Sequence, residues 1–533
     1  MDSGKIMKKF ALFIAAMALS IGSLCAAYKQ EDMLLYARTK PLKGVVPKFM
    51  RFAKEIVDDK YFESSLHAFG LMLGHPNYEG FSQKEGAAMF LFEGGSKKNI
   101  LFAAKFDKNS PIKADLIRKG LALKDVKGWT LITFDREALD GLTNVDWMLD
   151  IAGGDVKNDI EICPSVNKLV ENMNIDVFKK EMGPSFGEKI DRVAFLFYTI
   201  RDEIDELHRI CLAGNFDGPK TTILLQLKAK LGSDIGALWS AKVGGTTELP
   251  QLVFDVEPYI SLFANSNAKE NRTFTDKLNH KILKNCSYSD LDVLLKKIME
   301  KSKKFANKEN GQGIFHTVPD GENMGVLGIV GGKCSDADVK AMMDCDANLE
   351  DLISHCVGDS EIAKRVLLSP KFEHKSQYTY RKETVHFYGL PSGSEADSNE
   401  ESYACACNGN FVIATSKALV EKAIDNILDN ETRISLKEGH LCQASINLRQ
   451  IANGLLSENG SSSSHSLGDM KPVDMEIICG NNAQTIRVTF DNVSFREFGK
   501  ILVSSDSNAE TSKEELSSEK DETANQNQNL DQD

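Results

Sequence analysis

Residues 183–187 (Gly-Pro-Ser-Phe-Gly) have the spacing of the nucleophile elbow of serine hydrolases. In such an elbow the serine lies on a strained turn that follows a strand and precedes a helix, which exposes its hydroxyl oxygen for attack on a carbonyl. Here the predicted order is reversed, because residues 166–182 have a helical pattern and the apolar run 193–200 predicts a strand. Gly183 and Pro184 are therefore interpreted as a helix end and a turn, and a hydrolase is the least favoured function.

A glycine-rich stretch, residues 328–335, follows a predicted strand and resembles a phosphate-binding loop. The loop motif requires glycine where Leu327 stands, and serine or threonine directly after the lysine, where Cys334 stands. Without that hydroxyl the usual magnesium ligand is missing. Ser335, with Asp338 three residues later, is instead predicted to cap a helix.

Asp344, Asp346 and Asn348 are spaced like the first ligands of a calcium loop. The sixth position of that loop holds Leu349 instead of glycine, and the twelfth holds His355 instead of glutamate. The acidic residues that follow Leu349 are predicted to begin a helix, where they suit the helix dipole.

Cys405 and Cys407 alternate with alanines, which places both sulfur atoms on one face of a predicted strand. They are either a metal or redox pair or small buried side chains, and we favour the second interpretation. No C-x-x-C motif is present, and no histidine has zinc-finger spacing from a cysteine pair. An even number of cysteines beyond Cys25 permits disulfides in an oxidising compartment, at positions 163, 211, 286, 334, 345, 356, 405, 407, 442 and 479.

The remaining candidate residues have ordinary structural interpretations. His67 and His75 flank apolar residues, so one of them is interpreted as a core or boundary histidine. The lysine-rich stretch 290–308 is either an anion-binding helix face or a solvated face, and we favour the latter. The sequence therefore predicts no catalytic residue, no metal site and no cofactor.

The elements that would position any site begin with alternating strands and helices. Asp135 is predicted to cap a helix, and Ser110 with Pro111 to open another that Gly120 closes. Residues 202–213 fit either a helix or a strand. Strands are predicted at residues 33–38, 87–92, 100–106, 129–134, 193–200 and 222–230, with a helix over 45–56.

The strand at 222–230 carries the clearest two-residue alternation. Ile223, Leu225 and Leu227 lie on one side of the strand, whereas Gln226 and Lys228 lie on the other. This period of two indicates an antiparallel sheet with one solvated face.

The order of elements repeats after residue 247, which predicts a duplicated chain with halves 28–246 and 247–503. The turn-rich stretch 244–250 is the predicted junction. We expect an α+β fold of two related halves, each a mainly antiparallel sheet backed by helices. In the second half we expect strands at 252–257, 325–330, 411–414, 442–448 and 486–491, a long helix capped by Ser289, and a helix capped by Thr415. The first of these strands would match 33–38, and the last two would match 193–200 and 222–230.

The N-terminus has the pattern of a signal peptide. Lys8 and Lys9 precede the apolar stretch 10–24, which is short for a membrane span, and small residues follow it. We expect residues 1–27 to be removed after Ala27 on export to the periplasm or outside the cell. The alternative is a lipoprotein acylated at Cys25. No later run of 18 apolar residues exists, so no membrane span is predicted in the mature chain.

The formal net charge of −13 disfavours nucleic acids and anionic membranes as bulk partners. Residues 504–533 contain nine acidic residues and two lysines and no aromatic residue. Such a tail has too little apolar surface to fold, so we expect it to be disordered. Polar, Ser-rich and Gly-rich composition also predicts flexible segments at 391–402 and 457–469.

Residues 33–38, 128–142 and 409–424 resemble an uncharacterised family of exported bacterial proteins with tandem α+β modules. The last two stretches each run from a strand into a capped helix. The resemblance implies export and duplication but no chemistry. We expect a non-enzymatic binding or structural protein of unknown ligand, whose partner is a protein or an apolar small molecule; the alternative is a carrier that holds a lipid or another apolar ligand on a curved sheet.

Overall fold

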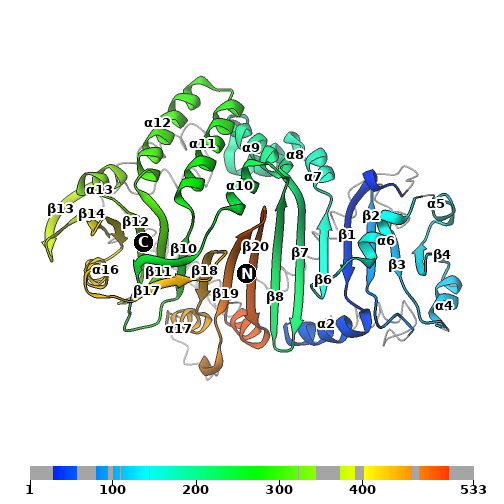
Figure 1. Cartoon of the computed structure of the whole chain (residues 1–533). Coiled ribbons are helices and arrows are strands. Elements are labelled where there is room, and N and C mark those ends of the chain that lie inside the picture. Colours follow the sequence, from blue (N-terminus) through cyan, green and yellow to red (C-terminus); the bar gives the residue numbers. More distant parts are fainter. Residues whose placement is uncertain are drawn as a thin grey trace, which may run out of the picture.

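The computed structural model describes residues 28–56, 80–93, 100–108, 110–142, 144–321, 323–343, 373–389, 401–458 and 467–502. Within these residues the chain forms one large antiparallel sheet of 18 strands, with helices on both of its faces (Figure 1). A separate small sheet pairs β9 (Gly245–Pro250) with β17 (Arg433–Leu436). The predicted α+β class is confirmed.

The large sheet is continuous from one end of the molecule to the other. Its spatial order is β4-β5-β3-β2-β1-β6-β7-β8-β20-β19-β18-β10-β11-β12-β16-β15-β14-β13. The strands are β1 (Met33–Thr39), β2 (Ala87–Phe92), β3 (Ile100–Ala104), β4 (Ala122–Val126), β5 (Trp129–Thr133), β6 (Ile160–Pro164), β7 (Leu207–Asp217), β8 (Lys220–Ala229), β10 (Ile260–Asn265), β11 (Glu309–Asp320), β12 (Asn323–Gly332), β13 (Glu373–Tyr380), β14 (Glu383–Gly389), β15 (Glu401–Cys407), β16 (Asn410–Ala414), β18 (His440–Ile446), β19 (Val473–Gly480) and β20 (Ala483–Asp491).

The helices cover the ends of the strands and the two ends of the sheet (Figure 1). They are α2 (Leu42–Ile56), α4 (Ile112–Arg118), α5 (Arg136–Asp140), α6 (Asp146–Gly153), α7 (Val166–Asn172), α8 (Ile175–Phe186), α9 (Ala194–Asp205), α10 (Asp234–Ser240), α11 (Ala268–Asn285), α12 (Ser289–Ala306), α13 (Asp336–Met343), α16 (Lys417–Asp429), α17 (Leu448–Glu458) and a helix over 492–502.

Local sequence accounts for several of these elements. Asn481 and Asn482 join β19 to β20 with φ angles of 52° and 58°, as a two-residue type I′ hairpin turn requires. Asp135 accepts a hydrogen bond from the backbone N–H of Ala138 at 3.0 Å and so caps α5, as predicted. The sequence therefore specifies this turn through residues that tolerate a positive φ, and this cap through a side chain that accepts a free backbone N–H.

One face of the sheet is covered only towards its two ends. At one end, α5 and α6 pack on β2, β3 and β5 around the fully buried Phe90, Leu101 and Leu131. At the other end, α16 packs on β12, β15 and β16 around Leu327 and Val412. The central strands between these two clusters carry polar side chains on this face.

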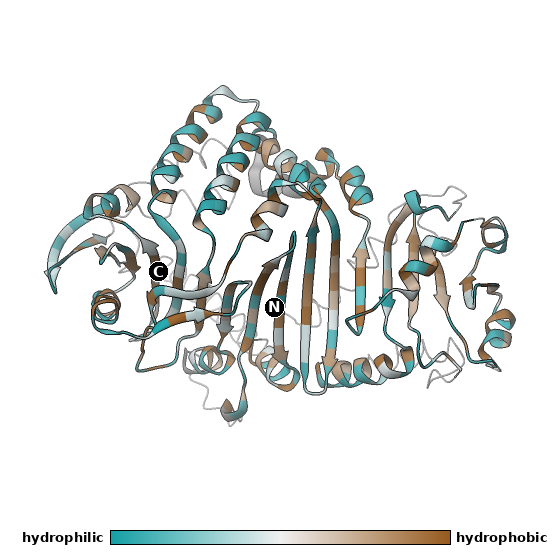
Figure 2. Ribbon diagram, viewed as in Figure 1, coloured by the Kyte–Doolittle hydropathy of each residue, from teal (hydrophilic) through white to brown (hydrophobic). Residues whose placement is uncertain are grey.

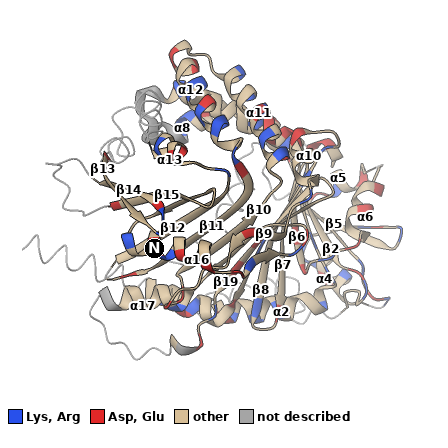
Figure 3. Ribbon diagram, turned by 60° about the vertical axis from the view of Figure 1, so that its left-hand side comes forward, with Lys and Arg blue, Asp and Glu red and all other residues tan. Residues whose placement is uncertain are grey.

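The opposite face of the sheet is covered near the ends of its central strands. Near one end of the central strands, α10 brings Trp239 against Leu207 and Cys479, and near the other end Phe490 packs with residues of α2 and α17. Figure 2 shows hydrophobic and polar residues mixed along the central strands. Lysines, arginines and acidic residues are interspersed on α11 and α12 (Figure 3).

The predicted strand over 193–200 is wrong, because this segment begins helix α9. Its buried residues alternate, with Phe195 and Phe197 each 5% exposed and Leu196 39% exposed, which resembles a strand pattern. The alternation arises because α9 packs against α11 on one side and against α7 and α8 on another, so more than one side of the helix is buried. Residues 202–213, which fitted either a helix or a strand, contain the end of α9 and the start of β7.

Four predictions from residue 244 onward are also wrong. Residues 252–257 form no strand, and the strand that follows the small sheet is β10. Residues 245–250, expected to be rich in turns, form β9, although Gly244 does adopt a φ of +84°. Ser416 rather than Thr415 caps α16, and Ser289 is the first residue of α12, with Tyr288 at the cap position.

Several predictions fall outside the described residues: the signal segment 1–27, His67 and His75, the calcium-like stretch 344–355 and the tail 504–533. The segments expected to be flexible are described only at their ends. Residues 401 and 402 belong to β15, residues 457 and 458 to α17, and residues 467–469 to a 3-10 turn.

Candidate binding groove

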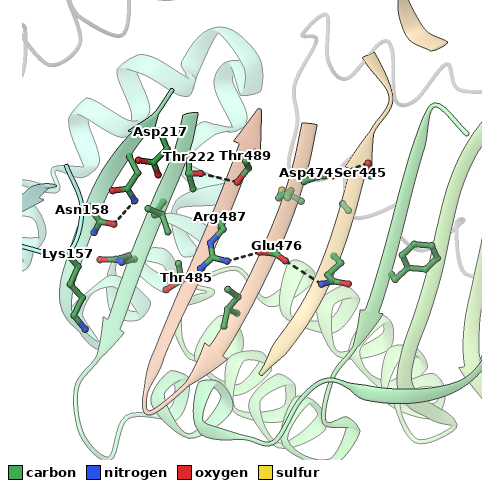
Figure 4. A pocket seen from close by; sticks show the side chains of 18 residues that line it. Lys157, Asn158, Asp217, Thr222, Ser445, Asp474, Glu476, Thr485, Arg487 and Thr489 are labelled. Carbon is green, nitrogen blue, oxygen red and sulfur yellow. Dashed lines mark hydrogen bonds and ion pairs between the residues drawn. The ribbon is translucent and has the colours of Figure 1, made fainter. Parts of the chain in front are cut away.

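A cavity of about 890 Å³ lies on the partly covered face of the sheet, over its central strands (Figure 4). We call this cavity the central groove. Its wall comes from β7, β8, β20, β19, β18 and β10 and from the segment before β6. The lining residues are Lys157, Asn158, Asn215, Asp217, Thr222, Leu224, Gln226, Phe263, Gln443, Ala444, Ser445, Asp474, Met475, Glu476, Ile478, Thr485, Arg487 and Thr489.

Strand register explains why most of these side chains share a face. In β8 every second residue lines the groove, namely Thr222, Leu224 and Gln226. The register sets them opposite three residues of β20, because Thr222 pairs with Thr489, Leu224 with Arg487 and Gln226 with Thr485. Directly opposite residues in antiparallel strands point to the same side of a sheet.

Side-chain hydrogen bonds link neighbouring strands along the groove floor (Figure 4). The hydroxyl oxygens of Thr222 and Thr489 are 3.2 Å apart across the β8–β20 pairing, which we call the seam. Arg487 donates to Glu476 at 2.9 Å, and Gln443 donates to the other carboxylate oxygen at 3.4 Å. These contacts fix the polar side chains relative to one another.

A second polar network closes the end of the groove near β6. The amide of Asn215 donates to Asn158 at 2.9 Å, and Asn158 donates to Glu161 at 2.9 Å. Glu161 also binds Arg38, with Oε2 2.8 Å from Nη2, and Arg209 at 3.3 Å. Burial would raise the pKa of Glu161, but the hydrogen bonds from Arg38 and Asn158 outweigh this effect and leave the pKa lowered.

The neighbouring carboxylate of Asp159 is held by its surroundings in the same way. It accepts the backbone N–H of Phe216 at 3.0 Å and pairs with Lys48 at 3.2 Å. Burial alone would raise its pKa, but these partners lower it. Both acids are therefore ionised at neutral pH and fix the backbone that carries Asn158.

The structure gives the two glycine motifs no catalytic or phosphate-binding geometry. Residues 183–186 lie within α8, so Ser185 does not occupy a turn between a strand and a helix, and the helix continues beyond the predicted end at Gly183. Gly328 and Gly332 lie in the extended strand β12, and the N–H of Cys334 donates to the carbonyl of Gly409 at 2.7 Å. Ser335 does pair with Asp338, whose carboxylate accepts its N–H at 2.8 Å.

The cysteine pair of β15 belongs to the core. Cys405 and Cys407 are fully buried in the cluster under α16, in agreement with the favoured interpretation. A row of three polar side chains lies on β13, β14 and α13: His386 Nε2 is 2.5 Å from Asp336 Oδ1, and His386 Nδ1 is 3.2 Å from His374 Nε2. Across the described ranges, no group of three or more His, Cys, Asp or Glu residues is arranged to hold a metal ion.

Lysines of α12 pair with nearby acids, as on a solvated face. Lys296 lies 2.7 Å from Asp292, and Lys303 lies 3.0 Å from Asp276 of α11. No residue of the groove is predicted as a site residue from the sequence. The polar side of the strand 222–230 is the one sequence feature that falls in the groove wall, and it indicates only a solvated face.

No helix in the described part of the chain is both long and apolar enough to cross a membrane. Comparison of the chain with models of protein families, with curated proteins and with solved structures gave no match, so no activity or ligand is transferred to it from a relative.

Proposed function

We propose that the protein is an exported, non-enzymatic binding protein whose central groove takes a hydroxyl-rich polar ligand such as an oligosaccharide. The observation that carries this proposal is the composition of the groove wall: most of its side chains are hydroxyls, amides, carboxylates or cations. Phe263 adds a ring. A sugar offers many closely spaced hydroxyls, each a donor and an acceptor, together with an apolar ring face.

The electrostatics of the groove favour a neutral ligand over a strongly charged one. Three carboxylates line it, from Asp217, Asp474 and Glu476, and two cations, from Lys157 and Arg487. Since Arg487 is bound to Glu476, neither sign of charge dominates. Charge-assisted hydrogen bonds to a neutral hydroxyl are stronger than neutral ones, so such groups suit an uncharged polar ligand.

The expected duplication belongs to the same proposal: residues 28–246 and 247–503 are related halves that meet at the seam. Strand order supports it. In the first half, β1 has β2, β3 and β5 on one side and β6, β7 and β8 on the other. In the second half, β10 has β11, β12 and β16 on one side and β18, β19 and β20 on the other. In this alignment β6, not residues 193–200, is the counterpart of β18, and β1 is the counterpart of β10.

Export with cleavage after Ala27 also remains part of the proposal. The basic start, the short apolar stretch and the small residues at 25–27 support it. N-terminal sequencing of the protein from its own host tests it: a mature start at Tyr28 is expected, an acylated Cys25 means a lipoprotein, and an intact Met1 or Met7 contradicts export.

A carrier of an apolar ligand is the second candidate, favoured by the opposite face of the sheet. There Leu225 of β8, Ile486 of β20 and Ile477 of β19 lie opposite one another across neighbouring strands and are only half-buried. Phe315 of β11, opposite Gly328 and next to Leu262 in register, is 38% exposed.

Binding measurements on a panel of neutral oligosaccharides, by calorimetry, test the first candidate. Arg487→Ala is expected to weaken binding by 10-fold or more, since a hydrogen bond to a charged group contributes about 1.5–3 kcal/mol. The matched control is Arg433→Ala on β17, which lies outside the groove wall and should bind as the wild type does.

The two candidates give different results. If native mass spectrometry of protein purified from its own host finds a retained lipid, and Leu225→Asp abolishes its retention while Arg487→Ala does not, the carrier is correct. If no oligosaccharide binds, or if Arg487→Ala and Arg433→Ala bind equally, the groove proposal is wrong.

A further inference from the structure

Two cysteines face each other beneath the end of the central groove. Cys163 lies on β6 and Cys211 on β7, and their side chains are 1% and 0% exposed. The β6–β7 register pairs Ile162 with Leu212, so the next residue of β6 stands opposite the preceding residue of β7. Their Sγ atoms are 2.6 Å apart, closer than two non-bonded sulfur atoms pack.

We propose that Cys163 and Cys211 form a cross-strand disulfide bond in the mature protein. Opposite residues of antiparallel strands have Cα atoms about 4.5–5.5 Å apart, within the range of about 4.4–6.8 Å that a disulfide spans. The bond therefore forms without moving either strand. It links residues 48 positions apart and fixes β7 to β6 beside Glu161.

The bond forms by thiol–disulfide exchange with a small-molecule or protein disulfide as the oxidant. The Cys163 thiolate attacks one sulfur of the oxidant, whose S–S bond breaks, and a mixed disulfide results. The Cys211 thiolate then attacks the Cys163 sulfur and releases the oxidant sulfur that was bound to it in the mixed disulfide. The two thiols lose two protons and two electrons, and the oxidant is reduced to a dithiol or to two thiols.

The surroundings favour Cys163 as the attacking group. The hydrogen bond from Cys211 is the main reason that the pKa of Cys163 is lowered to about 6, and Tyr36 and Arg209 act in the same direction against the effect of burial. Arg209 Nη2 lies 3.3 Å from the Cys163 sulfur. Once the disulfide has formed, Arg209, which is half-buried, still pairs with Glu161, so oxidation leaves this cation with a counter-charge.

Other described cysteines lack this arrangement and serve as internal controls. Cys405 and Cys407 are equally buried, but they lie two apart on one strand. Cys442 and Cys479 lie on adjacent strands, but the register pairs Cys442 with Ile477 instead. These four cysteines are expected to remain thiols.

The test uses full-length protein refolded with excess glutathione disulfide, then denatured and alkylated without reduction. Peptide mass spectrometry is expected to find Cys163 joined to Cys211, with a loss of two hydrogens that reduction restores, and alkylated Cys405 and Cys407. In Cys211→Ser, Cys163 should become alkylable, whereas Cys405→Ser should keep the link.

Two results would overturn the proposal. One is alkylation of both Cys163 and Cys211 in the oxidised wild-type protein. The other is a bond from either of them to a different cysteine. Both results are measured on the wild-type chain, so they hold even where a serine variant fails to fold.

Discussion

Replacing Glu161 by glutamine removes a buried negative charge while nearly preserving the shape of the side chain. The Glu161 side chain is 4% exposed and that of Arg38 is 11% exposed. Arg38 donates to Glu161 through Nε at 2.9 Å, and Arg209 and Asn158 bind the same carboxylate. In the variant, the Arg38 guanidinium stays buried with no carboxylate beside it in this network.

The magnitude follows from burial. Breaking a buried ion pair by removing one partner costs about 3–5 kcal/mol, because the remaining charge is desolvated and uncompensated. The control variant is Asp276→Asn, which breaks the exposed pair with Lys303, whose side chains are 52% and 59% exposed. Such pairs contribute less than about 1 kcal/mol. We therefore expect a difference of about 2 kcal/mol or more between the two variants.

Urea unfolding followed by circular dichroism measures both variants. The experiment is repeated across pH, because the folded pKa of Glu161 is lowered. The stabilisation from its ionised form is fully present above the unfolded pKa of about 4.3 and is lost as the pH falls through the folded pKa. The gap between wild type and Glu161→Gln should therefore narrow in acid.

Two outcomes would refute this reasoning. One is a cost of Glu161→Gln that matches that of Asp276→Asn at neutral pH. The other is a gap between wild type and Glu161→Gln that stays constant from neutral pH to below about pH 4, since the charge of the carboxylate would then not be its source.

Three further predictions concern other parts of the chain. Reducing the Cys163–Cys211 bond should lower the free energy of unfolding by up to about 4 kcal/mol, judged by urea titration with and without reductant, because the bond closes a loop between residues 48 apart. Burial lowers the pKa of His316 to about 4. Because the unfolded chain then binds a proton at higher pH than the folded chain, the free energy of unfolding should fall by up to about 3 kcal/mol between pH 6.5 and 4. Urea titrations of His316→Phe should lack this part of the pH dependence. A chain ending at Val503 should melt like the full-length protein in calorimetry, because the acidic tail has little apolar surface to bury; a clearly lower melting temperature would show that the tail packs on the body.

Sequence patterns predicted short apolar strands and local caps. The strand over 87–92 matches β2, in which Phe90, Leu91 and Phe92 are all buried, and Asp135 caps α5 as predicted. The helix α9 was missed because neighbours on more than one side bury alternating residues, Phe195 and Phe197 among them. A local period is informative only where a single packing partner creates it.

The groove could not be predicted because its residues are adjacent only after distant strands pair. Thr222 and Thr489 are 267 positions apart in sequence and form one contact across the seam. Each contributing strand shows only a polar side, and a polar side is what any solvated antiparallel strand has. The cysteine pair of β6 and β7 was missed for the same reason, because 48 residues separate its members and register alone makes them opposite.

The position of the groove connects binding to the integrity of the sheet. β8 and β20 pair continuously from Lys220–Asp491 to Lys228–Ala483, and this seam alone joins the run of strands from 28–246 to the run from 247–503 in the described sheet. The groove lies directly over the seam and takes side chains from both sides, Gln226 on β8 and Thr485 on β20 among them. A ligand that contacts both sides binds only while the seam is paired, so its binding free energy adds to the free energy that holds the two runs together. Under the proposed function, occupancy of the groove would therefore stabilise the whole sheet.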